Sequence, residues 1–374
     1  MAGIYVHIPF CRQKCHYCNF HFAVSKRGKS SLIDAILSEI DLSKDYLNDE
    51  KIQSLYFGGG TPSILEMAEL DRIFEKIHAV YDIVPDAEIT LEANPDDIRR
   101  DYLQHLKSLG INRLSLGVQS FDDAILKKIN RSHTASEAKR SIAYILEAGF
   151  DDLSIDLIFG MPGSDVASWQ KELDQALEFP IPHFSLYNLT VEKRTALHYM
   201  VKTAQLILPS EDTMAQQFNF ASRYLTNKGF EHYEISNYAL PGRYAKHNTS
   251  YWKGEAYLGI GPSAHSFNGI GRQWNIANNS RYIKEIQSGI IPFESEMLSS
   301  ADHYNEYVLT RIRTMWGCEL EDIRGLGKDF EVHFIKNVQV YMEKGWVVRK
   351  KENFSLSLQG KLFSDAVASG LFFD

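Results

Sequence analysis

The chain has 374 residues, of which 44% are hydrophobic, 24% are charged and four are cysteine. A chain of this length can fold without disulfide bonds, and it predicts two or three domains or one large α/β barrel with an appendage. The net charge of −8 argues against a general nucleic-acid-binding protein, because such proteins present a basic face. No apolar run or leader-like N-terminus stands out, so we expect a cytoplasmic protein with no nucleic-acid partner and no transmembrane segment.

Alternating strand and helix patterns run from the N-terminus to about residue 240. Short apolar runs predict strands at residues 4–8, 52–57, 89–92, 114–118, 153–159 and 184–187. Apolar residues at helical spacing predict helices at residues 33–40, 70–77, 138–146 and 214–225. Thr134 and Glu137 are spaced as the capping box of the third of these helices. Repeated strand–helix units predict a parallel sheet covered by helices, with its functional groups at the carboxyl ends of the strands.

Two further segments follow this alternating region. Residues 238–294 are rich in glycine and aromatic residues, and we expect a loop-rich segment that closes the barrel. Residues 295–374 contain helical patterns followed by strand patterns at residues 346–349 and 354–358, which predicts a small helical, winged-helix-like domain with a hairpin. Residues 1–237 would then form the barrel and carry a loop with three cysteines.

Three of the four cysteines are clustered, at Cys11, Cys15 and Cys18. Zinc sites usually combine a C-x2-C unit with a second, distant pair, and this sequence has no second pair. Three thiolates on one loop suit three irons of a [4Fe–4S] cluster, which favours soft sulfur ligands. The fourth iron would then be open to a small molecule. Cys318 stands alone, and we expect it to be a small buried apolar residue.

The sequence around the clustered cysteines resembles the start of a known family. The string Tyr5-Val-His-Ile-Pro-Phe-Cys11, followed by Cys15, Tyr17 and Cys18, is similar to radical S-adenosylmethionine (SAM) proteins, and more narrowly to oxygen-independent coproporphyrinogen III oxidases. The resemblance implies that the three cysteines hold the cluster and that the amino and carboxylate groups of SAM bind its fourth iron. It also implies a partial (β/α)6 barrel, which strand counting alone does not distinguish from an open sheet.

Further motifs of this family follow in order along the chain. Residues 58–62 read Gly-Gly-Gly-Thr-Pro after a predicted strand, and glycines there let the backbone approach a ligand. Without the resemblance, Glu92 would be a solvated or paired carboxylate and Asp156 part of a buried ion pair. The guanidinium of Arg131, downstream of the string Gly-Val-Gln-Ser-Phe, suits the carboxylate of SAM. The resemblance implies SAM contacts from Tyr5, Tyr17, Gly59, Gly60, Thr61, Glu92, Gln119, Arg131, Asp156 and Thr190.

Two functions from different classes fit these motifs. The first is the oxidase reaction, in which a radical made by reductive cleavage of SAM leads to oxidative decarboxylation of two propionates of coproporphyrinogen III. The second is that of a heme chaperone of the HemW type, which shares the cluster and SAM motifs. Such a protein would bind heme and pass it to recipient hemoproteins such as respiratory enzymes.

Three departures from the oxidases favour the HemW type. The oxidases have a further cysteine two residues after the third, where this chain has Phe20, and an extension before the motif, whereas Tyr5 is here nearly the first residue. The string His-Asn-Thr-Ser-Tyr-Trp at residues 247–252 matches the HNxxYW motif of HemW-type proteins, whose histidine is implicated in heme binding. We therefore expect heme near His247, a sensible axial ligand, although a structural histidine is the alternative. His265 is a second candidate.

Overall fold

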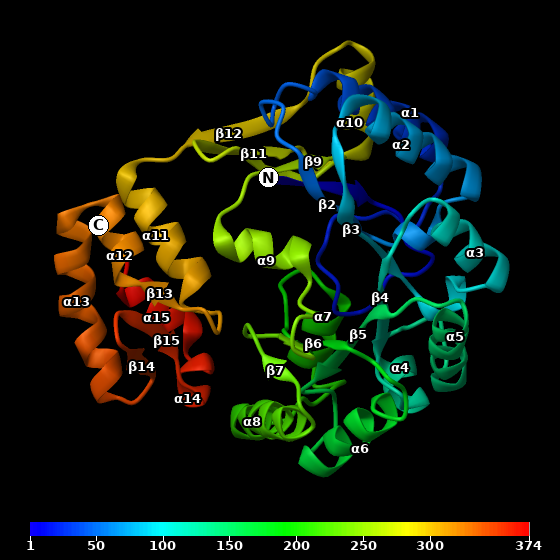
Figure 1. The fold of residues 1–374 in the computed structure, drawn as a ribbon. Helices are drawn as coiled ribbons and strands as arrows, with labels where there is room; N and C mark the ends of the chain where they lie inside the picture. Colours follow the sequence, from blue (N-terminus) through cyan, green and yellow to red (C-terminus); the bar gives the residue numbers. More distant parts are fainter. Residues whose placement is uncertain (374) are drawn as a thin grey trace.

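The computed structural model describes residues 1–373, and its main feature is a mixed sheet of twelve strands. Strands β1 to β6 are parallel neighbours in chain order, with helices in the connections between them (Figure 1). These strands are β1 (Ala2–Ile8), β2 (Ile52–Gly59), β3 (Ile83–Ala93), β4 (Arg113–Gln119), β5 (Asp152–Phe159) and β6 (His183–Asn188). The partial (β/α)6 barrel expected from the resemblance is therefore confirmed.

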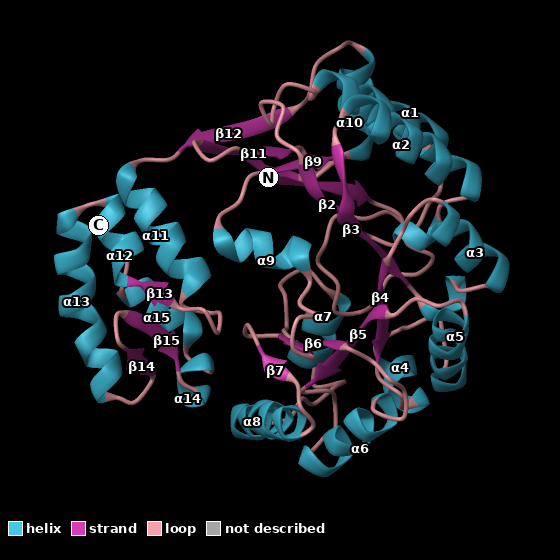
Figure 2. Cartoon of the chain, viewed as in Figure 1, coloured by secondary structure: helices cyan, strands magenta, loops and turns pink. Residues whose placement is uncertain are grey.

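Helices cover the outer face of these strands (Figure 2). They are α1 (Lys29–Leu42), α2 (Met67–Val80), α3 (Arg100–Ser108), α4 (Asp123–Lys128), α5 (Ala135–Glu147), α6 (Val166–Ala176) and α8 (Glu211–Asn227). Helix α7 (Ala196–Lys202) lies instead beside the cysteine loop, where the Leu197 N–H donates to the His16 carbonyl at 2.8 Å. Thr134 and Glu137 form the predicted capping box at the start of α5. None of the helices within residues 1–373 combines the length and the hydropathy that crossing a membrane requires.

The glycine- and aromatic-rich segment forms regular elements, so the expectation of a loop-rich segment is wrong. With the preceding short strand, these elements are β7 (Glu231–His232), β8 (Asn237–Ala239), α9 (Lys246–Lys253), β9 (Tyr257–Ile260), β10 (His265–Phe267), β11 (Gly271–Asn275), α10 (Asn279–Gln287) and β12 (Phe293–Met297). The glycines permit close strand packing: a Cβ at Gly259 would lie 2.1 Å from the carbonyl oxygen of His265, and one at Gly271 would lie 2.6 Å from that of Glu296.

These strands extend the sheet at both edges and do not close it. Strand β9 pairs in parallel with β1, and β8 pairs antiparallel with β6. The sheet order is β12-β11-β10-β9-β1-β2-β3-β4-β5-β6-β8-β7, so β12 and β7 lie at opposite edges. The barrel therefore stays open, and residues 1–237 and 238–294 share one sheet.

Helix α9 packs inside the curve of the sheet, toward the amino ends of the strands (Figure 1). The backbone N–H groups of Lys246 and His247 donate to the carboxylate of Glu88 on β3, at 2.7 and 2.9 Å. Because a helix N-terminus carries partial positive charge, this carboxylate stabilises the start of α9. The His247 ring lies 2.8 Å from the hydroxyl of Ser54 on β2, which fixes the helix against a second strand.

The C-terminal residues form a smaller unit with its own hydrophobic core. Its elements are α11 (Ser300–Arg311), β13 (Cys318–Glu319), α12 (Leu320–Leu326), α13 (Lys328–Glu343), β14 (Val347–Lys350), β15 (Asn353–Leu356), α14 (Leu358–Lys361) and α15 (Ser364–Gly370). Its antiparallel sheet has the order β13-β15-β14, and β14 and β15 form the expected hairpin after the helices. Cys318 is 0% exposed in this core, as predicted.

Candidate functional site

A cavity of about 440 Å³ opens at the carboxyl ends of the barrel strands. Its walls are the cysteine loop after β1, the glycine loop after β2 and the ends of β3 to β6. Every residue predicted to bind the cluster or SAM lines it except Tyr5, namely Cys11, Cys15, Tyr17, Cys18, Gly59, Gly60, Thr61, Glu92, Gln119, Arg131, Asp156 and Thr190. The fold thus brings to one place residues that are distant in the sequence.

The three clustered cysteines are partly exposed on the loop after β1. The hydroxyl of Thr61 donates to Cys11 Sγ at 3.5 Å, and Arg131 Nη1 donates to Cys15 Sγ at 3.4 Å. Burial raises the pKa of Cys11 to about 11 and also raises that of Cys18, so bound iron would have to displace their protons.

The three thiols all come from the loop after β1 and line the cavity. Within residues 1–373, no three His, Cys, Asp or Glu side chains are grouped as the ligands of one metal ion. A [4Fe–4S] cluster instead takes one thiolate for each iron. Three separate thiols on one loop therefore fit three irons of such a cluster.

The glycine loop after β2 packs tightly against the end of β1. Gly59 has a left-handed backbone with φ of +108°, and a Cβ there would lie 2.6 Å from the His7 ring. A Cβ at Gly60 would lie 2.7 Å from the carbonyl oxygen of Phe10. The Gly60 N–H donates to the Ile8 carbonyl at 2.9 Å. Glycine is required at both positions, and the loop presents bare backbone to the cavity.

Arg131 is held at the cavity wall by several acceptors. Its Nη2 donates to Asn94 Oδ1 at 2.7 Å and to the Gly117 carbonyl at 2.6 Å, while its Nε has no hydrogen-bond partner among the described residues. A buried donor without a partner is costly, so this group is suited to a ligand carboxylate. Sequence reasoning did not single out Asn94, although it lies two residues after Glu92; its side-chain amide also donates to the Thr61 hydroxyl at 3.2 Å.

Gln119 has a strained backbone at the same wall. Its φ of +69° lies in the left-handed region, and the register between β4 and β5 shifts between Leu116 and Gln119. Such strain in a residue other than glycine is often found at functional sites. The irregularity ends β4 at the cavity.

Two buried carboxyl groups face the cavity. Glu92 accepts a hydrogen bond from the hydroxyl of Tyr56 at 2.8 Å, and Asp156 accepts from the hydroxyl of Ser115 at 3.2 Å. Burial raises the pKa of Glu92 to about 7 and that of Asp156 to about 6, because it disfavours the charged forms. No Lys, Arg or His of residues 1–373 forms a salt bridge with either group, so the buried ion pair considered for Asp156 is absent. The two groups are available to a ligand with positive charge or hydroxyl donors.

Tyr5 lies in the barrel interior, outside the wall of this cavity. Its ring stacks on that of Tyr56 with centroids 6.0 Å apart, and its hydroxyl lies 3.1 Å from Nδ1 of His7. Tyr5 lines a second, larger cavity instead. A role for Tyr5 in SAM binding stays a prediction.

His247 lies deeper in the barrel, where it is 1% exposed. Its ring stacks on Tyr56, with centroids 5.0 Å apart. Nδ1 lies 2.8 Å from the Ser54 hydroxyl, and Nε2 lies 2.7 Å from the Tyr251 hydroxyl. Both ring nitrogens therefore have partners in this structure, and His247 lines neither cavity.

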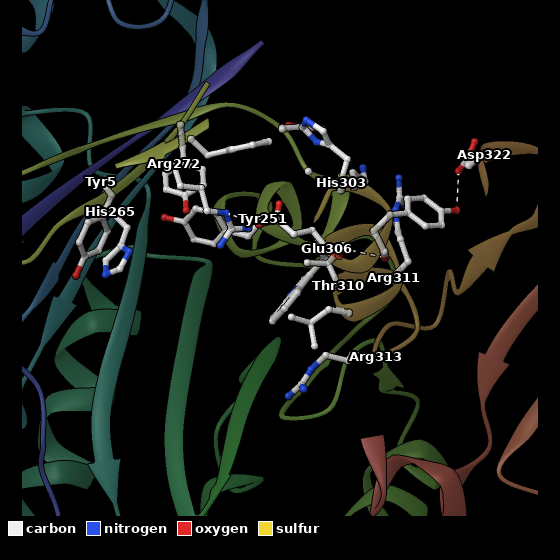
Figure 3. Close-up of a pocket in the computed structure, with 18 of the residues that line it drawn as sticks. Tyr5, Tyr251, His265, Arg272, His303, Glu306, Thr310, Arg311, Arg313 and Asp322 are labelled. Atoms are coloured by element: carbon white, nitrogen blue, oxygen red, sulfur yellow. Dashed lines mark hydrogen bonds and ion pairs between the residues drawn. The ribbon is translucent and has the colours of Figure 1, made fainter. Parts of the chain in front are cut away.

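The second cavity measures about 1270 Å³ and lies between the extended sheet and the C-terminal unit (Figure 3). Its sheet wall includes Tyr257, Phe267 and Arg272, which the register of β9, β10 and β11 places side by side. The opposite wall comes from α11 and α12, and the Tyr251 end of α9 contributes a third side. Phe20 lines both cavities, so the two adjoin at the cysteine loop. Sequence reasoning missed this cavity because its walls come from five separated segments.

Comparisons with known proteins agree with this arrangement. A family model described as the Radical SAM superfamily matches residues 5–176. The heme chaperone HemW of Lactococcus lactis subsp. lactis is 34% identical over 331 residues, which cover 86% of this chain and 86% of that protein. The chain belongs to the HemW family. The heme chaperone HemW of Bacillus subtilis is 30% identical to this chain over 371 residues, which cover 98% of each of the two chains.

A solved structure shows the same fold as this HemW-family chain. The coproporphyrinogen III oxidase HemN of Escherichia coli superposes with a TM-score of 0.88 and 23% identity, covering 99% of this chain and 90% of that one. Membership of the radical SAM superfamily implies a [4Fe–4S] cluster and SAM as cofactors. The residues present fit both groups: three thiols on one loop, a glycine loop without side chains, and the unpaired Nε–H of Arg131.

Proposed function

We propose that the protein is a heme chaperone, which binds heme and delivers it to hemoproteins such as respiratory enzymes. The observation that carries the proposal is the similarity, over 86% and 98% of the chain, to two proteins named heme chaperone HemW. The adjoining cavities support it, because they offer one chamber for the cluster and SAM and another for a larger ligand.

For the first cavity, we assign the cofactors to the residues that line it. Cys11, Cys15 and Cys18 would each bind one iron, which leaves the fourth iron open to the amino and carboxylate groups of SAM. That cluster supplies the electron-transfer and SAM-binding chemistry. The backbone of residues 59–61 would receive the amino group, and the Nε–H of Arg131 would meet the carboxylate. The remaining contacts with SAM would come from Tyr17, Glu92, Gln119, Asp156 and Thr190, with Thr190 near the adenosine. Tyr5, which stacks on Tyr56 outside the cavity wall, would contact SAM from the barrel interior.

The size and lining of the second cavity support the proposal. Its volume of about 1270 Å³ exceeds the roughly 300–1,000 Å³ of common ligand pockets, so the cavity has room for a macrocycle. Trp252 and Tyr257 offer aromatic faces to a porphyrin, and Arg272 and Arg311 offer positive charge to its propionates. His265 and other histidines on its walls offer nitrogen ligands to iron.

The oxidase reaction is the second candidate, because the fold matches that of HemN over nearly the whole chain. Against it stands Phe20, which occupies the position where the oxidases have a further cysteine and which is 70% exposed at the junction of the two cavities. The sequence thus differs from the oxidases at Phe20, a residue that lines both cavities.

Two assays on one preparation separate the two functions. The cluster is reconstituted anaerobically, and heme is titrated by absorbance while conversion of coproporphyrinogen III is followed with SAM and a reductant. We expect stoichiometric heme binding, transfer of the heme to an apo-cytochrome, and no decarboxylation. Sustained decarboxylation without heme transfer would overturn the proposal.

A further inference from the structure

The HNxxYW motif divides into two parts with different surroundings. His247 is buried beneath Tyr56, and both of its ring nitrogens have hydrogen-bonding partners. Burial lowers the pKa of His247 to about 3, so the ring is neutral and can donate only one of these two bonds. For either nitrogen to reach a metal in a cavity, helix α9 would have to give up its contacts with Ser54 and Glu88.

The aromatic end of the motif, in contrast, reaches the larger cavity. Tyr251 and Trp252 both line it. The Tyr251 hydroxyl lies 2.7 Å from Nε2 of His247, and the two rings meet edge to face with centroids 4.9 Å apart. His247 therefore contacts Tyr251 from the barrel interior, and the Tyr251 ring forms part of the cavity wall.

Four histidines line the larger cavity, and they differ in what their rings already bind. His7 has partners on both nitrogens, at Tyr5 and at the His21 carbonyl, and His21 is engaged by Asn279 at 2.6 Å. His265 and His303 have no side-chain hydrogen bond to any residue of the described chain. A metal ligand needs a free nitrogen lone pair, so these two are the candidates.

His265 is the more rigidly placed of the two. It begins β10, where it pairs with Trp274 of β11, and the two rings stack with centroids 6.1 Å apart. The side chain is exposed and stands beside Tyr5 at the cavity (Figure 3). Partial burial, with the charge of Arg272 second, lowers the pKa of His265, which favours the neutral form that binds iron. His303 stands on α11 of the C-terminal unit, across the cavity.

We infer that His265 binds the heme iron from the sheet wall of the larger cavity, and that His247 acts through Tyr251, which it holds against the bound macrocycle. The inference rests on the proposed heme-chaperone function. It makes His247 a positioning residue and explains why one motif contains a buried histidine and two cavity-lining aromatic residues.

The test compares the heme-loaded, cluster-reconstituted protein with single variants by absorption, electron paramagnetic resonance and heme affinity. For His265→Ala we expect loss of the histidine-ligand signature, at least about tenfold weaker heme binding, and recovery of the signature with added imidazole. His303→Ala is the matched control, because it removes a free histidine from the opposite wall, and its signature should stay unchanged. An unchanged cluster spectrum shows that each variant is folded.

The role of His247 is tested on the same signature. His247→Ala and Tyr251→Phe should each weaken heme binding without changing the axial-ligand signature of the heme that does bind. In the double variant the two losses should not add, since both remove the same contact. An intact signature in His265→Ala, or a lost one in His247→Ala that imidazole restores, would overturn the inference. Absence of heme binding by the unsubstituted protein would instead overturn the proposed function.

Discussion

The hydroxyl of Tyr56 donates a hydrogen bond to Oε1 of Glu92 at 2.8 Å inside the barrel. This bond favours the ionised carboxylate, but burial opposes it more strongly and, together with the nearby Asp156, raises the pKa of Glu92 to about 7. The group therefore has an energetic cost in the empty site that a bound ligand can offset. The buried carboxylate would therefore lower the stability of the protein without ligand and be ready to contact SAM.

The first prediction concerns Glu92→Gln, which keeps an acceptor for Tyr56 and removes the charge. A carboxyl group whose folded-state pKa is raised destabilises the fold above that pKa, and the cost fades as the pH falls toward the ordinary value of about 4.5. At pH 8 the variant apoprotein should be more stable by about 1–3 kcal/mol, and at pH 5 the gain should be small. Urea unfolding at the two pH values measures this difference.

Binding of SAM should respond in the opposite direction. Glu92→Gln should weaken SAM binding at pH 8, as measured by titration of the reconstituted protein. In the unsubstituted protein the affinity for SAM should rise as the pH increases from about 5.5 to 8, because Glu92 and Asp156 ionise with pKa values of about 7 and 6. An affinity that does not change over this range would contradict a role for these carboxylates.

The second prediction concerns Cys15→Ser, which removes one thiolate of the cysteine loop. A hydroxyl is a poor ligand for iron in such clusters, so iron and sulfide contents after reconstitution should fall to about a tenth or less. Cys318→Ser is the control, because Cys318 is fully buried in the C-terminal core and should not affect the cluster. A normal iron–sulfur spectrum in Cys15→Ser would refute the cluster assignment.

The third prediction concerns Arg131→Lys. Lysine keeps the charge but loses the planar fork that reaches Asn94, the Gly117 carbonyl and a ligand at once. We expect SAM affinity to fall by about tenfold or more while the cluster still forms, measured by equilibrium dialysis against SAM. Arg140→Lys on the exposed face of α5 is the control. Equal affinities in the two variants would remove Arg131 from the SAM site.

The fourth prediction concerns Gly60→Ala. The added Cβ would lie 2.7 Å from the Phe10 carbonyl oxygen, so the glycine loop or the end of β1 must shift. Strain of this kind costs about 1–3 kcal/mol, and it should also weaken SAM binding because the loop lines that cavity. In Gly325→Ala the Cβ meets no atom within 4 Å, so stability should be unchanged or slightly improved.

The sequence predicted the barrel well where the patterns were long and local. Strand ends, the α5 capping box and the motifs of the first cavity were found because each depends on neighbouring residues. Helices α3 and α6 were not predicted; each is short, with 9 and 11 residues, and buries three of them. The segment around β9 to β12 was misjudged as loops because its glycines were interpreted as chain breakers, whereas they allow strands to pack closely.

Sequence alone determined the kind of cofactor chemistry in this protein, because ligand spacing and glycine loops are local features. It could not distinguish His247 from His265 as a heme ligand, because the two side chains are chemically identical and differ only in their surroundings. Tertiary contacts place the two rings differently: Ser54, Glu88 and Tyr251 hold His247 inside the barrel, while His265, paired with Trp274 of β11, is exposed at the larger cavity. Those contacts join residues far apart in the chain, and burial depends on them rather than on the residue type.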